Sequence, residues 1–153
     1  MKSLGALKTI LMEQEKCCKA LVDLLQKERA YLIDFEVAEI EELTKGKDTL
    51  LLRLRLLEEE RLRLTAALAA GPGGPPADVT LRGLVDRTAD AELSGIRLKL
   101  VSLAQSIEDL NNFNRHLVDR SLGSIRCATG FFQAFGGLRP DRSASGALVS
   151  RET

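Results

Sequence analysis

The residues of this chain that could take part in chemistry are few, and their spacing suits no reaction centre. General acid–base catalysis most often uses histidine, and His116 is the one histidine in the 153-residue sequence. A di-iron carboxylate site in a helical bundle needs Glu-x-x-His pairs on two helices, but the residue three positions before His116 is Phe113. The sequence therefore predicts no catalytic residue, no metal and no cofactor, and an enzyme is the least favoured interpretation.

The thiols do not change that interpretation. The chain has Cys17, Cys18 and Cys127, without metal-ligand spacing. Neighbouring residues on a helix point about 100° apart, so Cys17 and Cys18 cannot easily face one ion together. A thiol on an apolar helix face usually acts as a small core hydrophobe, and this is the role that we expect.

Charge and hydropathy exclude further classes of protein. Lys plus Arg and Asp plus Glu both total 22, so the net charge is zero, without the basic footprint of a nucleic-acid binder or a polybasic membrane-surface protein. No uncharged run approaches the ~20 residues of a membrane span. Met1–Lys16 also lacks the apolar core of a signal peptide. We expect a soluble, cytoplasmic protein without nucleic acid or stable membrane insertion.

The backbone pattern is that of long helices with coiled-coil-like seams. Leucine is abundant and aromatic residues are scarce, which favours an all-α fold. Three segments repeat seam residues at alternating steps of three and four. The first seam consists of Leu4, Leu7, Leu11, Cys18, Leu21, Leu25 and Leu32, interrupted by Gln14 and Glu28. The second consists of Ile40, Leu43, Lys47, Leu50, Leu54, Leu57, Arg61, Leu64 and Leu68. The third consists of Leu93, Ile96, Leu100, Leu103, Ile107, Leu110, Asn114, Leu117, Ser121 and Ser124.

Breakers and caps divide these segments. The run Gly71–Pro76 is made of Gly and Pro alone, and no helix crosses such a run. The join at Ile33–Phe35 contains no Gly or Pro, so it could be a kink rather than a turn, but we expect a break there. We expect Asp34 to cap the second helix, and Thr88 or Asp90 to cap the last. The prediction is an elongated antiparallel bundle over residues 1–137, with three long helices and one short one at about 3–32, 35–69, 79–86 and 90–135. Residues 138–153 are predicted to form a flexible tail.

Two stretches carry more apolar residues than a bundle seam needs. Six of the eight residues from Leu50 to Leu57 are leucine, and a helix that is apolar all round is normally buried all round. The stretch is either the centre of the bundle or a self-association surface. The candidate self-association residues, which point away from the main seam, are Leu51, Leu52 and Leu56.

The second stretch is the end of the last helix, where three of the five phenylalanines lie. Such a cluster favours a patch for a partner, although the rings could instead cover the open end of the bundle. An asparagine on a seam lowers stability but fixes register or partner. The candidate binding residues of this half-helix are Asn111, Asn114, Leu117, Val118, Leu122, Ile125, Phe131, Phe132 and Phe135.

The order of these features resembles the FlgN family of flagellar export chaperones over roughly Leu4 to Gly136. The shared motifs are Leu24-Leu25 with Lys27-Glu28-Arg29, Ile40-Glu41-Glu42-Leu43, Lys45/Lys47 with Leu50-Leu51, Leu57-Glu58-Glu59-Glu60-Arg61, and Asn111-x-x-Asn114-x-x-Leu117-Val118. The last motif is the most specific of them. The family often has a tyrosine near the end of the last helix, where this chain has phenylalanines, so no role is assigned to a phenolic hydroxyl.

The resemblance implies a small, all-helical, cytoplasmic chaperone of the flagellar type III export system. Such chaperones bind the disordered C-terminal segments of hook-associated proteins, which form the hook–filament junction, and keep them monomeric. They then bring the client to the cytoplasmic part of the export gate. The competing interpretation is a structural coiled-coil protein whose helices serve self-association alone and which has no client.

Overall fold

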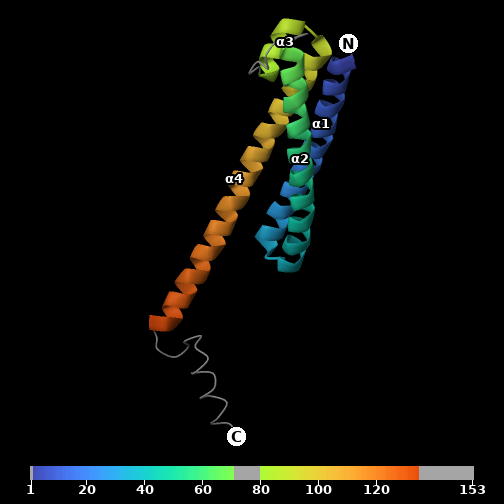
Figure 1. Cartoon of the computed structure of the whole chain (residues 1–153). Coiled ribbons are helices and arrows are strands. Elements are labelled where there is room, and N and C mark those ends of the chain that lie inside the picture. Colours follow the sequence, from blue (N-terminus) through green and yellow to red (C-terminus); the bar gives the residue numbers. More distant parts are fainter. Residues whose placement is uncertain (1, 71–79, 135–153) are drawn as a thin grey trace. The chain divides into compact units, whose positions relative to one another are not determined.

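The computed structural model describes residues 2–70 and 80–134. These residues form four helices: α1 (Lys2–Asp34), α2 (Val37–Ala70), α3 (Leu81–Thr88) and α4 (Ala91–Ala134) (Figure 1). The predicted all-α fold is confirmed, because the long helices pack against one another as a bundle and the described residues contain no strand. Three predicted features, the Gly71–Pro76 loop, Phe135 and the tail 138–153, lie outside the described residues.

The chain divides into two compact units. The first unit is Met1–Asn114 and holds α1, α2, α3 and the first part of α4. The second unit is Arg115–Thr153, and its described part is the remainder of α4, residues 115–134. The boundary follows directly after Asn114.

In the first unit, α1 and α2 pack as an antiparallel pair along their predicted seams. The buried residues of α1 are Leu7, Leu11, Gln14, Cys17, Leu21, Leu25 and Glu28. The two polar residues that interrupt the seam in the sequence, Gln14 and Glu28, are thus buried with it. One seam position was predicted wrongly: Cys17 is only 4% exposed, whereas Cys18 is half-buried. The reason is that Cys18 lines an open groove, which none of the four described helices covers.

The hydrophobic core lies where α3 packs against the three long helices. Its buried members are Leu7, Leu11, Leu64, Leu84, Leu93 and Ile96, so every helix contributes at least one residue. Figure 1 shows α3 at the end of this unit that holds the N-terminus. A fully buried leucine side chain stabilises a fold by about 1.5–3 kcal/mol, so this cluster is what holds the short helix α3 in place.

The chain turns between α1 and α2 where a break was predicted, but the predicted cap is wrong. Asp34 does not cap α2; it is the last residue of α1. Phe35 adopts a left-handed conformation (φ 55°), and the N–H of Glu36 donates to the carbonyl of Tyr31 at 3.0 Å. This hydrogen bond closes a six-residue turn that contains one left-handed residue, which is the Schellman motif found at the C-termini of helices. The backbone therefore reverses without glycine or proline, at a conformational cost carried by Phe35.

Side chains cap the N-termini of α3 and α4. Thr80 Oγ1 accepts from the N–H of Gly83 at 3.1 Å, and Asp90 Oδ1 accepts from the N–H of Leu93 at 2.9 Å. Of the two predicted caps for the last helix, Asp90 is therefore the one used. The Lys8 ammonium lies 2.9 Å from Asp90 Oδ2 and 2.7 Å from Glu92 Oε2, which ties the start of α4 to α1.

Candidate functional site

The second unit exposes a row of apolar side chains along α4. Val118, Leu122, Ile125 and Phe132 are all exposed, with accessible fractions between 39% and 58%. Their spacing of four, three and seven residues continues the period of the α4 seam, so they lie on one face of the helix. We call these four residues the α4 stripe. Leu117, which precedes the stripe, is half-buried.

Two aromatic rings lie at the end of this helix. Phe131 and Phe132 meet edge to face, with ring centroids 5.8 Å apart and an interplanar angle of 78°. Both rings remain accessible, at 59% and 47%. An edge-to-face pair keeps its geometry while presenting a large apolar surface, and such rings are typical anchors of protein interfaces.

Asn114, another predicted binding residue, is buried in the first unit. Its Nδ2 donates to the carbonyl of Leu25 and to Glu28 Oε1, both at 3.0 Å. Glu28 Oε2 in turn accepts from Lys47 Nζ at 2.8 Å. We call Asn114, Glu28 and Lys47 the polar layer, because they join α4, α1 and α2 at one level of the bundle. Asn111 is exposed, unlike Asn114.

The candidate self-association residues lie on the outer side of α2. Leu51, Leu52 and Leu56 are 47%, 60% and 58% exposed. Leu50, Leu54 and Leu57 are partly buried, as expected of the seam. The leucine run is therefore not enclosed by the other described helices, and part of it faces outward.

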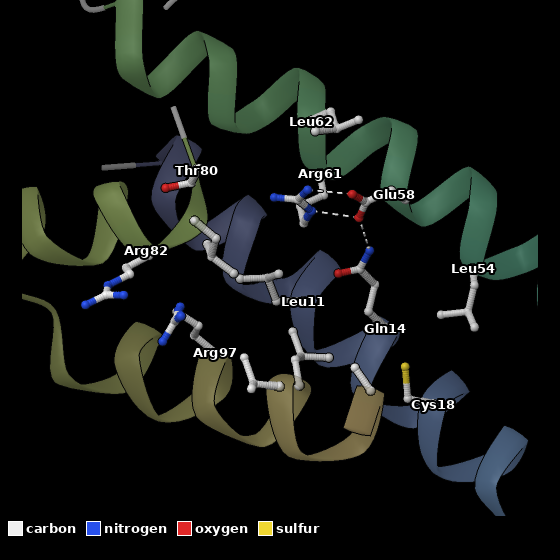
Figure 2. A pocket seen from close by; sticks show the side chains of 14 residues that line it. Leu11, Gln14, Cys18, Leu54, Glu58, Arg61, Leu62, Thr80, Arg82 and Arg97 are labelled. Atoms are coloured by element: carbon white, nitrogen blue, oxygen red, sulfur yellow. Dashed lines mark hydrogen bonds and ion pairs between the residues drawn. The ribbon is translucent and has the colours of Figure 1, made fainter. Parts of the chain in front are cut away.

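A groove opens between all four helices of the first unit, with a volume of about 560 Å³ (Figure 2). Its apolar lining includes Leu11, Leu54, Leu62, Leu81, Leu100 and Val101. Arg61, Arg82 and Arg97 also line it, from α2, α3 and α4 respectively. The groove thus combines an apolar wall with three guanidinium groups.

One side of the groove carries a hydrogen-bonded polar cluster. Arg61 Nε donates to Glu58 Oε2 at 2.7 Å, and Gln14 Nε2 donates to the same oxygen at 2.9 Å. These hydrogen bonds, that of Arg61 above all, hold the pKa of Glu58 below its ordinary value against the opposing effect of partial burial. Burial raises the pKa of the neighbouring Cys18 thiol, with a smaller contribution from Cys17.

The part of the chain that the structure describes shows neither a metal-ligand cluster nor a membrane-spanning helix. Within residues 2–70 and 80–134, no three His, Cys, Asp or Glu side chains are grouped closely enough to hold a metal ion. No helix in that part of the chain is both long and apolar enough to cross a membrane.

Comparison with protein families identifies the chain. The family model described as FlgN protein matches residues 1–134, which contain both units' described residues. The chain belongs to the FlgN family. No curated protein and no solved structure matched in the corresponding comparisons. The resemblance carried by the sequence motifs is thereby confirmed, and membership assigns this protein to the chaperones of flagellum biogenesis and export, a family that is not enzymatic.

Sequence reasoning found the FlgN-type motifs but missed how two of them interact. Glu28 and Asn114 belong to different motifs and meet in the polar layer. A pattern in the sequence could have indicated which polar seam residues meet. Gln14 and Glu28 on α1 are two heptads apart, and so are Lys47 and Arg61 on α2. In an antiparallel pair, these polar interruptions fall at matching levels. Arg82 and Arg97 carried no periodic signal and were missed altogether.

Proposed function

We propose that this FlgN-family chaperone binds the C-terminal segments of hook-associated proteins through the second unit of the chain, in the cytoplasm. Binding keeps the client monomeric, and the chaperone then brings it to the cytoplasmic domain of the flagellar export gate. Neither the client nor the gate follows from family membership alone. The observation that carries the proposal is the α4 stripe, an exposed apolar face on a helix of an export chaperone.

The chemistry of the stripe supports a helical client. Its members recur at helical spacing, and an amphipathic client helix is recognised through apolar residues at i, i+3, i+4 and i+7. Exposed apolar faces of this kind mark interaction sites on soluble proteins. The proposed client surface consists of Leu117, Val118, Leu122, Ile125, Phe131 and Phe132, together with Asn111 at its start and Phe135, which lies outside the described residues.

Asn114 has a different position in this proposal. Its amide is buried and hydrogen-bonded to α1, so a client can contact it only after the polar layer opens. That Asn114 binds the client stays a prediction, which a client-dependent change in the protection of the Asn114 side chain would test.

The test is to replace Phe131 and Phe132 together by alanine. Calorimetry should show that binding to the C-terminal peptide of a hook-associated protein weakens by at least ~2 kcal/mol, which is the scale of an interface hot spot. The free protein should melt at nearly the same temperature, because exposed rings contribute little burial. Unchanged binding together with a large fall in melting temperature, from a loss of ~3–5 kcal/mol per buried ring, would contradict the proposal.

Leu52→Ala with Leu56→Ala is the matched control. It also removes two exposed apolar side chains, but from α2, and should leave peptide binding unchanged. The same variant tests the second candidate function, a self-associating coiled-coil protein, which the exposure of Leu51, Leu52 and Leu56 favours. If sedimentation shows a stable oligomer that this variant dissociates, and no hook-associated peptide binds, the coiled-coil function replaces the chaperone–client one.

A further inference from the structure

The groove of the first unit has no part in the proposed client surface. Its lining comes from residues between Leu11 and Ala104, whereas the client surface lies almost wholly in the second unit. Two of its apolar residues, Leu62 of α2 and Val101 of α4, are 53% and 52% exposed. These two exposed apolar side chains come from two different helices of the groove, and exposed apolar surface of this kind is typical of a site for a partner with apolar side chains.

The length of the groove suits a helix of about two turns. Its lining extends on α1 from Leu11 to Cys18 and on α4 from Arg97 to Ala104. Each of these stretches rises by ~10 Å at 1.5 Å per residue. A helix laid in such a groove presents apolar residues at i, i+3 or i+4, and i+7 over the same distance.

Charge defines the partner further. Arg61 is neutralised by Glu58, but Arg82 and Arg97 have no hydrogen bond or ion pair with any residue in the described ranges 2–70 and 80–134. Figure 2 draws both guanidinium groups towards the α3 end of the groove, away from Leu54 and Cys18. A guanidinium binds a carboxylate with two parallel N–H donors, more selectively than it binds other groups of a polypeptide.

We propose that this groove binds an acidic amphipathic helix of a protein partner. Apolar side chains of that helix contact Leu62, Leu81, Leu100 and Val101, and one or two of its carboxylates pair with Arg82 and Arg97. The groove shares no residue with the proposed client surface. This inference does not depend on the identity of the client.

A peptide selection tests the proposal. Display a library of helical peptides of about 14 residues, roughly four turns, with apolar residues at i, i+3, i+4 and i+7 and randomised flanking positions, against the full chain. Glutamate and aspartate should be enriched beside the apolar face. The selected peptides should lose at least tenfold in affinity for Arg82→Glu with Arg97→Glu, and peptides with lysine at the enriched positions should recover binding to that variant.

Arg87→Glu with Lys99→Glu is the control. It makes the same change of charge on α3 and α4, at exposed residues outside the groove, and should leave the affinity within twofold of the original. Cys18 supplies an independent readout of position, because it lines the groove. Bound peptide should slow its alkylation by iodoacetamide at least fivefold, as measured by peptide mass spectrometry.

Several outcomes would overturn the proposal. These are a selection without acidic enrichment, equal binding to the Arg82→Glu, Arg97→Glu variant, or an unchanged rate of Cys18 alkylation. A change in the sedimenting mass of the free protein on that double substitution would assign the groove to a second copy of the chain instead. Failure of the client proposal is distinguishable: Phe131→Ala with Phe132→Ala should leave binding of the selected peptides intact, and the double arginine variant should still bind the hook-associated peptide.

Discussion

Glu28→Ala is the substitution that tests the polar layer most directly. Glu28 accepts one hydrogen bond from Lys47 and one from Asn114, and its side chain is only 11% exposed. A hydrogen bond to a charged group contributes about 1.5–3 kcal/mol, and breaking a buried ion pair costs about 3–5 kcal/mol. Lys47 is 21% exposed and can turn to water, which reduces the loss. We expect Glu28→Ala to lower the free energy of unfolding by about 3 kcal/mol.

Urea unfolding followed by circular dichroism measures this loss. For a chain of this size, about 3 kcal/mol corresponds to a fall of roughly 6–12 °C in melting temperature. Glu42→Ala is the control: it removes a carboxylate that is 78% exposed and paired with Lys45, and should change stability by less than ~0.5 kcal/mol. If both variants lose equally little, the polar layer does not stabilise the bundle.

A double-mutant cycle then tests whether Glu28 and Asn114 contact each other. Asn114→Ala alone should cost less than Glu28→Ala, because it also removes a buried Oδ1 that has no partner among the described residues. The two substitutions should couple by at least ~0.5 kcal/mol, as contacting residues do. Strict additivity would refute the contact, and with it the packing of α4 on α1 at this level.

Two further predictions concern a strained turn and the effect of acid. Phe35→Gly should raise the free energy of unfolding by about 0.5–1 kcal/mol in urea titrations. Glycine adopts the left-handed conformation without a steric penalty, and little burial is lost because the Phe35 side chain is 67% exposed. Phe35→Ala keeps the steric penalty, so an equal gain in stability from alanine would contradict this reason. Glu58 and Asp90 have pKa values below their ordinary 4.5 and 3.8, chiefly because Arg61 and the N–H of Leu93, respectively, hydrogen-bond the ionised forms. The ionised carboxylates of Glu58 and Asp90 stabilise the folded state fully above these ordinary pKa values. That stabilisation is lost as the pH falls through their lower pKa values in the folded state, so the urea midpoint should drop between pH 7 and about pH 3. Asp90→Asn should reduce that drop, since asparagine caps a helix without titrating, and an unchanged pH dependence would exclude a role for Asp90.

The sequence predicted the seams well because a seam is a local property. Alternating steps of three and four place side chains on one side of a helix wherever it lies, so Leu43 and Leu64 of α2 and Leu93 and Ile96 of α4 are buried as expected. The FlgN-type motifs were also readable, since they depend on the order of residues along the chain. The turn at Phe35 was less predictable, because a left-handed phenylalanine has no local signature.

Tertiary structure decided which seam residues meet and where the bundle stays open. Strict alternation of three and four placed Cys18 on the seam, but in the packed bundle Cys17 is buried and Cys18 stays accessible in the groove beside α1. Arg82 and Arg97 look like ordinary surface arginines in the sequence, and only the packing of α3 through Leu84 brings them to one groove. The sequence by itself thus determined the helices, their buried faces and the family. The groove and the polar layer depend on distances between residues far apart in the chain, and these are determined only when the helices pack together.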